Sequence, residues 1–191
     1  RAAQLPSATL QYGDYAAWQR ERLEGPELAT SIDFWKHALA EAADHIDWPM
    51  GQPQGPESPA AEVSFQWSEE LSERLRHTAK AERMSMFSLL HAMFAAFLAR
   101  FTEQADITIG IPTTLRERPE LQGLIGLLLN TVPMRSQVSF GTSFRTWARS
   151  AEDAWRQTAA HRWVPLQRIV NATGAARSAA GLPLFDIMFT Y

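Results

Sequence analysis

The sequence predicts an α/β protein with a layered mixed sheet and flanking helices. Segments with the period of an amphipathic helix alternate along the chain with short apolar segments typical of strands. Hydrophobic residues make up 46% of the 191 residues and charged residues 20%, so the chain can bury a sizeable core. One stretch rich in Pro and Gly, residues 49–60, indicates a long irregular connection.

The first part of the chain, residues 1–49, is expected to form entry helices. Aromatic side chains at three-residue spacing predict one helical face over residues 10–25, formed by Tyr12, Tyr15 and Trp18. A second helix is predicted over residues 30–43, with Ser31 as its N-cap. Residues 50–61 are expected to be a loop, and residues 62–191 the α/β core.

The core is expected to open with a strand and two helices. Residues 62–67 have the alternation of a half-buried strand, with three side chains inward: Val63, Phe65 and Trp67. Ser68 is expected to cap a helix that ends near residue 83, and Ser85 a helix over residues 86–101. This last helix is apolar almost all round and should be deeply buried.

Two strands are predicted next, over residues 106–112 and 132–138. Gly110 inside the first indicates a close approach of another backbone or a substrate. Pro133 is expected at the start of the second. Residues 113–123 between them are a polar loop.

In the last part of the chain, the sequence predicts an amphipathic helix over residues 143–161. It also predicts a short helix with Pro165 near its first turn. Residues 183–191 read as a strand with one apolar face, formed by Phe185, Ile187, Phe189 and Tyr191. This strand would leave an open sheet edge, and the first residue is not Met. We therefore expect the chain to be part of a longer protein.

Composition argues against several classes of function. The net charge is −3 without a basic block, which gives no support to nucleic-acid binding. No apolar run approaches the length of a membrane span, and no signal-peptide pattern opens the chain. Cysteine is absent, which excludes disulfides, thiolate metal sites and a cysteine nucleophile and is compatible with a reducing cytoplasm.

No catalytic apparatus can be assembled from the residues alone. The nucleophile-elbow, phosphate-loop, dinucleotide-binding and H-E-x-x-H patterns are all missing. The five histidines are far apart and lack metal-ligand spacing. For His91, in the most apolar helix, a hydrogen-bonded core histidine is favoured over a catalytic one by about three to one. For His161, a cation at a helix C-terminus and a functional role stand at roughly even odds.

Asn130 and Thr131 follow a strongly apolar run and have two interpretations. They can form a turn in which their side chains satisfy local backbone groups. Alternatively, their polar tips face a channel, where an amide can donate to and accept from a thioester or amide. The residues alone favour the turn by roughly two to one.

Several motifs occur in the order found in the condensation domains of nonribosomal peptide synthetases, which the chain resembles. "YGDYAAWQR" is similar to Y-x-D-Y-A-x-W through Tyr12, Asp14, Tyr15, Ala16 and Trp18. "DITIGIPTTLR" is similar to D-x-x-x-G-x-P-x-x-x-R through Asp106, Gly110, Pro112 and Arg116. "IGLLLNT" is similar to I-G-x-F-V-N-T through Ile125, Gly126, Asn130 and Thr131.

Three further motifs, one near the start of the chain and two near its end, support the resemblance. "FWKHAL" is similar to Y-W-x-x-x-L, with Phe34 in place of Tyr. "HRWVPL" matches H-x-x-x-P-F through His161 and Pro165, with Leu166 where Phe is usual. "RSAAGLPLF" resembles R-D-x-S-R-x-P-L-F through Arg177, Pro183, Leu184 and Phe185, without its Asp, Ser and second Arg.

The resemblance implies one lobe of a chloramphenicol-acetyltransferase-like fold, in which two lobes face each other across a tunnel. Donor and acceptor carrier proteins would deliver thioesters on phosphopantetheine arms, with no cofactor bound directly and no metal. The catalytic histidine of such domains lies in an H-H-x-x-x-D-G motif of the N-terminal lobe, which this chain lacks. The chain is thus identified with the C-terminal lobe and is expected to be inactive alone, with the N-terminal lobe as its partner.

The resemblance also implies roles for residues. The substrate-tunnel residues would be Asn130, Thr131, Gly126 and Trp18, and residues 113–124 would bridge beneath the tunnel. The motif residues with structural roles would be Tyr12, Asp14, Tyr15, Arg116, His161, Pro165, Arg177, Pro183 and Phe185. The apolar run before Asn130 is then interpreted as buried packing. An Asn130→Ala substitution is expected to slow condensation with little loss of folding.

Other functions remain open beside amide-bond formation in antibiotic or secondary-metabolite biosynthesis. A noncatalytic condensation-like platform would recruit a carrier protein or a tailoring enzyme. An ester-forming relative would differ only in the acceptor nucleophile. A heterocyclising relative has its distinguishing motif in the other lobe, and the I-G-x-x-x-N-T-V-P form is closer to condensation than to epimerisation.

Overall fold

The computed structural model describes residues 10–43, 45–49, 61–175 and 183–191. The predicted alternation of helices and strands along the chain is not found: among the described residues four helices come first, then two strands, then two helices. The elements are α1 (Tyr12–Arg22), α2 (Glu27–Ala38), α3 (Glu69–Ala81), α4 (Met86–Thr102), β1 (Asp106–Thr114), a 3₁₀ turn (Pro119–Leu121), β2 (Leu129–Gln137), α5 (Phe144–Ala160) and α6 (Leu166–Thr173).

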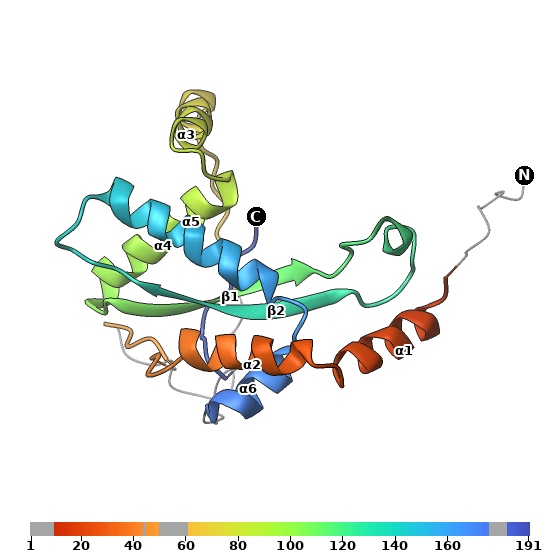
Figure 1. Cartoon of the computed structure of the whole chain (residues 1–191). Helices are drawn as coiled ribbons and strands as arrows, with labels where there is room; N and C mark the ends of the chain where they lie inside the picture. Colours follow the sequence, from red (N-terminus) through yellow and green to blue (C-terminus); the bar gives the residue numbers. More distant parts are fainter. Residues whose placement is uncertain (1–9, 44, 50–60, 176–182) are drawn as a thin grey trace, which may run out of the picture.

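The sheet is a long antiparallel hairpin of β1 and β2, in which Gly110 lies opposite Pro133. Met188 adds one parallel bridge to Gly110, so the pairing is mixed. Figure 1 shows α4 and α5 over one face of the hairpin and α2 and α6 over the other. The predicted layered architecture with flanking helices is confirmed.

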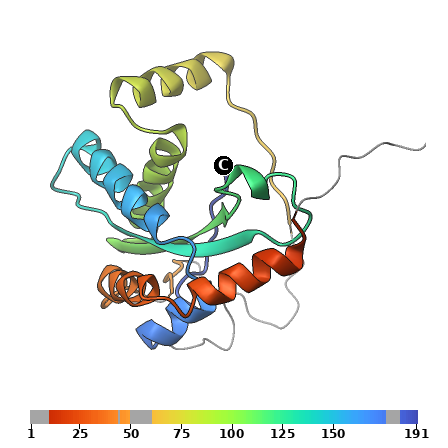
Figure 2. The ribbon, with the colours of Figure 1, turned by 45° about the vertical axis from the view of Figure 1, so that its right-hand side comes forward.

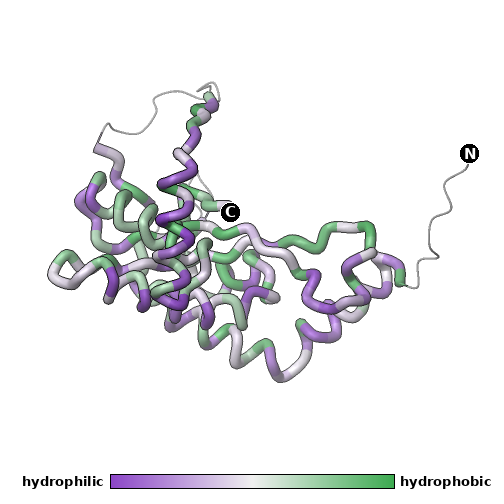
Figure 3. The backbone as a smooth tube through the Cα atoms, turned by 90° about the horizontal axis from the view of Figure 1, so that it is seen from above, coloured by the Kyte–Doolittle hydropathy of each residue, from purple (hydrophilic) through white to green (hydrophobic). Residues whose placement is uncertain are grey.

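Two apolar clusters hold these layers together. The large one joins the hairpin to the helices on both faces and includes Trp35 of α2, Ile109 of β1, Val132 of β2 and Ile169 of α6. The small one lies between α1 and the β1–β2 loop and contains Tyr15, Leu121, Leu124 and Leu128. Seen from above, α1 and the end of the hairpin form an arm beside the body (Figure 3).

Gly110 is required by its neighbours, as the sequence predicted. A Cβ atom at this position would overlap the ring of Phe185. Its backbone N–H donates to the Ile187 carbonyl at 2.8 Å, and its carbonyl accepts from the Phe189 N–H at 2.9 Å. Because these bonds use the side of β1 away from β2, Gly110 and Pro133 form a pair without mutual hydrogen bonds. Pro133 therefore fits inside β2, rather than at its start as predicted, although it lacks an N–H.

Two predicted strands are absent from the described residues. Residues 61–68 carry no strand, and the three side chains expected to point inward are exposed at 86%, 74% and 45% (Val63, Phe65 and Trp67). The alternation is present in the sequence, but no described strand lies alongside to cover it. Residues 183–191 make only the bridge at Met188, and Tyr191 is exposed rather than on a buried face.

The helix starts follow local chemistry in most cases. The Ser68 and Ser85 side chains cap α3 and α4, as predicted. Ser31 is not a cap, because α2 begins earlier, at Glu27, and Ser31 is a buried residue inside the helix.

One side of α4 is exposed through Met93, Phe97 and Phe101, so this helix is less buried than expected. Figure 2 shows α3 standing away from the hairpin.

Among the described residues, no individual helix has both the length and the apolarity to cross a membrane. Only α3 and α4 taken together pass that test, and they meet at a bend of 106°.

Candidate functional site

The β1–β2 loop is held by Arg116, one of the motif residues. Its guanidinium donates to the carbonyls of Leu121 and Leu124, each at 2.6 Å, and to that of Gly126 at 3.3 Å. Hydrogen bonds from a charged donor are stronger than neutral ones. Arg116 therefore holds the backbone of this loop in one conformation, through hydrogen bonds to three of its carbonyls.

Helix α1 packs against the same loop through the predicted aromatic face. The Tyr12, Tyr15 and Trp18 rings follow one another at centroid distances of 5.9 and 5.8 Å. The Tyr12 hydroxyl donates to the Leu127 carbonyl at 3.3 Å, and a Cβ at Gly126 would overlap the Tyr12 ring. Asp14 accepts from the Gln11 N–H at 2.9 Å and so closes the start of α1.

The apolar run before Asn130 is only half buried. Leu124 and Leu128 belong to the small cluster, whereas the residues between and after them are exposed at 92%, 70% and 62% (Ile125, Leu127 and Leu129). The interpretation of this run as buried packing is wrong for its alternate residues. We call these three exposed side chains the apolar tip.

Asn130 lies in β2 and not in a turn, and its amide makes three hydrogen bonds. Its Nδ2 donates to the carbonyls of Arg162 and Val164, both at 2.7 Å. Its Oδ1 accepts from the Leu166 N–H at 3.3 Å. Both amide hydrogens are thus bonded to the connection between α5 and α6, and neither is available to a substrate in this conformation.

His161 ends α5 and is held by α2. Its Nδ1 shares a hydrogen bond of 3.0 Å with the Ser31 hydroxyl, and its ring stacks on Phe34 at 4.2 Å. Its carbonyl accepts from the Trp35 indole N–H at 3.3 Å. Burial lowers the pKa of His161 below its usual value, which favours the neutral ring over a cation at the helix end.

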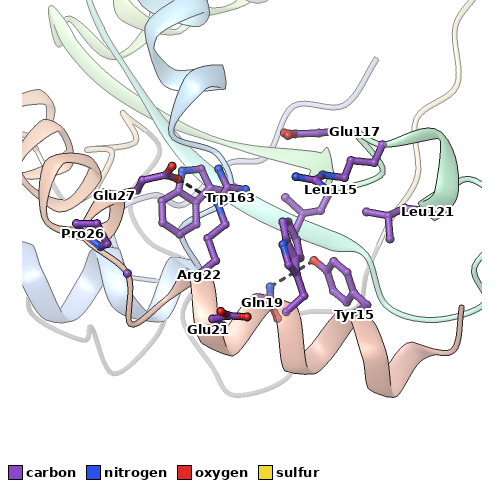
Figure 4. Close-up of a pocket in the computed structure, with 13 residues that line it drawn as sticks. Tyr15, Gln19, Glu21, Arg22, Pro26, Glu27, Leu115, Glu117, Leu121 and Trp163 are labelled. Carbon is purple, nitrogen blue, oxygen red and sulfur yellow. Dashed lines mark hydrogen bonds and ion pairs between the residues drawn. The ribbon is translucent and has the colours of Figure 1, made fainter.

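A pocket of about 570 Å³ opens between α1, the start of α2, the β1–β2 loop and Trp163 (Figure 4). The Arg22 guanidinium lies 4.1 Å from the Trp163 ring centroid and 5.5 Å from that of Trp18, and Arg118 lies 5.2 Å from Trp18. Cations over indole rings are attracted by the ring quadrupole. Arg22 and the two tryptophans thus form ordered walls of this pocket.

Two ion pairs involve residues that line the pocket. Arg22 pairs with Glu27 at 3.5 Å, and Arg162 pairs with Glu117 of the β1–β2 loop at 3.0 Å. The second pair joins the α5–α6 turn to the loop that Arg116 holds.

The remaining predicted residues lie apart from this pocket. Thr131 is half-buried in β2 opposite Pro112, and Pro165 precedes α6 directly, as expected. Phe185 is buried against Gly110 with Pro183 nearby in the chain. Arg177 lies outside the described residues.

His91 is a core residue, but not the hydrogen-bonded one that was expected. Its ring is fully buried, and neither nitrogen has a hydrogen-bond partner among the described residues. The rings of Phe87 and Phe189 lie 5.9 Å from it. Burial lowers its pKa from 6.5 to about 4, so it is neutral near pH 7.

Sequence reasoning missed Arg22, Arg118 and Trp163. The spacing of four residues between Trp18 and Arg22 places both on one side of α1 and could have indicated their contact. No local signal connects Trp163 with α1, because the contact spans most of the chain.

Comparison with protein families gives one match over residues 1–191, to the condensation domain. A dimodular nonribosomal peptide synthase from Bacillus subtilis is 31% identical over 198 residues, which cover 100% of this chain and 8% of that protein. Phosphinothricin tripeptide synthetase PhsB from Streptomyces viridochromogenes is 34% identical over 98% of this chain and 16% of its own length. The chain thus spans a small part of these relatives.

Solved structures share the fold. The X-domain from teicoplanin biosynthesis has a TM-score of 0.86 at 24% identity, over 98% of this chain and 43% of that one. The first condensation domain of the CDA synthetase has a TM-score of 0.78 at 20% identity, over 98% of this chain and 40% of its own.

Proposed function

Since the chain belongs to the condensation-domain family of nonribosomal peptide synthetases, we propose that it is the C-terminal lobe of such a domain. It would form one wall of the tunnel in which a carrier-bound amine meets a carrier-bound thioester. The observation that carries the assignment to one lobe is the coverage: 98% of this chain aligns with only 43% and 40% of the solved relatives. The choice of the C-terminal lobe is supported by the motifs at Tyr12, Asn130 and Pro183 and by the lack of an H-H-x-x-x-D-G motif in the sequence.

The proposed reaction joins a donor acyl or peptidyl thioester to an acceptor aminoacyl group. The acceptor amine nitrogen attacks the donor carbonyl carbon, a C–N bond forms and the C–S bond breaks. The donor phosphopantetheine leaves as a thiol and takes up the proton that the amine loses. Both arms belong to carrier proteins, so this lobe contributes position and shape rather than a bound cofactor.

The chain by itself is proposed to be inactive. His91 is buried, and the Nδ1 of His161 is shared with the Ser31 hydroxyl. The sequence also lacks the H-H-x-x-x-D-G motif that holds the catalytic histidine of the family. Attack by the amine needs a group that removes its proton or stabilises the developing charge. In our proposal that group comes from the N-terminal lobe.

The apolar tip supports a docking role toward that lobe. Ile125 and Leu127 on the loop and Leu129 at the start of β2 are exposed. Arg116 and Tyr12 hold this loop by hydrogen bonds to its backbone. Exposed apolar residues on a well-ordered scaffold are typical of interaction surfaces. The N-terminal lobe is the proposed occupant because the solved relatives contain more than twice the length that this chain covers.

Reconstitution tests the proposal. The chain is mixed with a histidine-bearing N-terminal lobe and two loaded carrier proteins, and the amide product is measured by mass spectrometry. We expect product only when both lobes are present. Product from this chain alone, or none from the complete mixture, contradicts the proposal.

A noncatalytic platform is the second candidate. It is favoured by the X-domain found in complex with OxyB, which has a TM-score of 0.87 to this chain. Capture of a carrier protein or tailoring enzyme by this chain without an N-terminal lobe would support it. An ester-forming or heterocyclising reaction is distinguished by offering hydroxyl or cysteinyl acceptors to the reconstituted domain.

A further inference from the structure

We propose that Asn130 is a positioning residue, which acts through the turn between α5 and α6 rather than by touching a substrate. This inference rests on the proposed function, in which this lobe forms one wall of the tunnel. Its basis is that all three hydrogen bonds of this side chain go to a single short segment: two to carbonyls at 2.7 Å and one from an N–H at 3.3 Å.

The bonds flank Trp163. The carbonyls that Asn130 binds belong to Arg162 and Val164, the residues on either side of Trp163. The backbone around this tryptophan is therefore fixed on both sides, and its indole is set against Arg22 at 4.1 Å. The same turn directs the Arg162 side chain to Glu117, 3.0 Å away. Asn130 thereby fixes one wall of the 570 Å³ pocket and its link to the β1–β2 loop.

The turn has a second, independent anchor. His161 is held by Ser31 and by the Trp35 indole N–H, both from α2. Val164 and Ile169 are also buried in the large cluster. Loss of the Asn130 bonds should therefore move the part of the turn that carries Trp163 without unfolding α6.

Asn130→Asp is the sharpest substitution because it keeps the size and shape of the side chain. It replaces the donor atom by a carboxylate oxygen that faces two carbonyl oxygens, so attraction becomes repulsion. Asn130→Ala removes the bonds without adding charge. Asn171→Asp is the matched control: it makes the same chemical change at an exposed position of α6, where the Asn171 Oδ1 accepts from the Gln167 side chain.

The first readout is the environment of Trp163. The chain is labelled with fluorotryptophan, and the ¹⁹F resonance of Trp163 is assigned by its loss in Trp163→Phe. Both Asn130 variants should shift this resonance, and Asn171→Asp should leave it in place. An unshifted resonance in both Asn130 variants overturns the proposal.

The second readout is kinetic, in the condensation domain that contains both lobes. Misplacement of a supporting group can cost a rate factor of about ten or more, so we expect kcat/KM to fall roughly tenfold in Asn130→Asp. If Asn130 acts through Trp163, the double variant Asn130→Asp/Trp163→Phe should be within about twofold of the slower single variant. Multiplied effects would indicate a separate contact and overturn the proposal, as would an unchanged rate.

The wild-type domain is measured first. If it forms no product, the proposed function itself is contradicted. If it forms product and the Asn130 variants match it, only the role assigned to Asn130 is wrong.

Discussion

Asn130 illustrates how the contacts of one residue can differ from those expected from a motif. The resemblance implied a residue of the substrate tunnel, and the expectation was an amide turned toward that tunnel. The structure instead bonds this amide to three backbone groups of the α5–α6 turn. Loss of the amide leaves these partly buried backbone groups without that partner, so Asn130→Ala should also lower stability, contrary to the expectation from the sequence.

The buried ring of His91 gives a prediction about pH. The unfolded chain takes up a proton on this residue below about pH 6.5, whereas the native ring remains neutral down to about pH 4. Between these values the unfolded state binds more protons, so stability falls as the pH falls. The contribution of this one group is of the order of 3 kcal/mol.

Urea unfolding of the wild-type chain and His91→Leu at pH 7 and pH 4.5 measures this effect. The variant should lose less stability between these pH values. At pH 7 it should be more stable by about 1 kcal/mol, since both ring nitrogens lack partners in the described structure. His77→Gln on exposed α3 is the control. Parallel pH profiles for the wild type and His91→Leu would contradict the argument.

At the scale of elements, the contact between β1 and the segment after residue 183 depends on Gly110. Gly110→Ala would drive a methyl group into the Phe185 ring. Overpacking of this kind typically costs about 2 kcal/mol. Urea unfolding should show this loss, whereas Gly123→Ala should be nearly neutral because nothing lies within 4 Å of its Cβ position.

Phe185→Leu supplies the second half of this test, because leucine leaves room for the added methyl group. The double variant Gly110→Ala/Phe185→Leu should be more stable than the sum of the single effects predicts. Simple additivity would show that the ring and the glycine do not constrain each other.

At the scale of the whole molecule, the apolar tip lies on the arm formed by α1 and the hairpin end. Leu127→Glu should weaken binding to an N-terminal lobe at least tenfold, because a charge would be buried at the contact. Isothermal titration calorimetry measures this binding. Phe97→Glu on the exposed side of α4 serves as the control, and the unfolding midpoint of Leu127→Glu should equal that of the wild type. Equal affinity of both variants would place the docking surface elsewhere.

The sequence by itself determined the fold class, most helices, both hairpin strands and the family. These follow from local chemistry: hydrophobic period, serine caps, and a glycine or proline at positions with special backbone needs. The same locality explains the errors at residues 62–67 and at Ser31. Alternation reports that one side of a segment suits burial, but it does not say whether another strand is present to cover it.

Only the tertiary structure decided which groups meet. The contacts of Trp163 with Arg22, of Asn130 with the α5–α6 turn and of His91 with Phe189 join parts of the chain that no sequence window contains. Packing on α1 likewise decides which residues of the apolar run before Asn130 are buried and which are exposed to solvent. The pattern of residues predicts which side chains favour burial, whereas the packing of distant elements determines which of them are buried and against what.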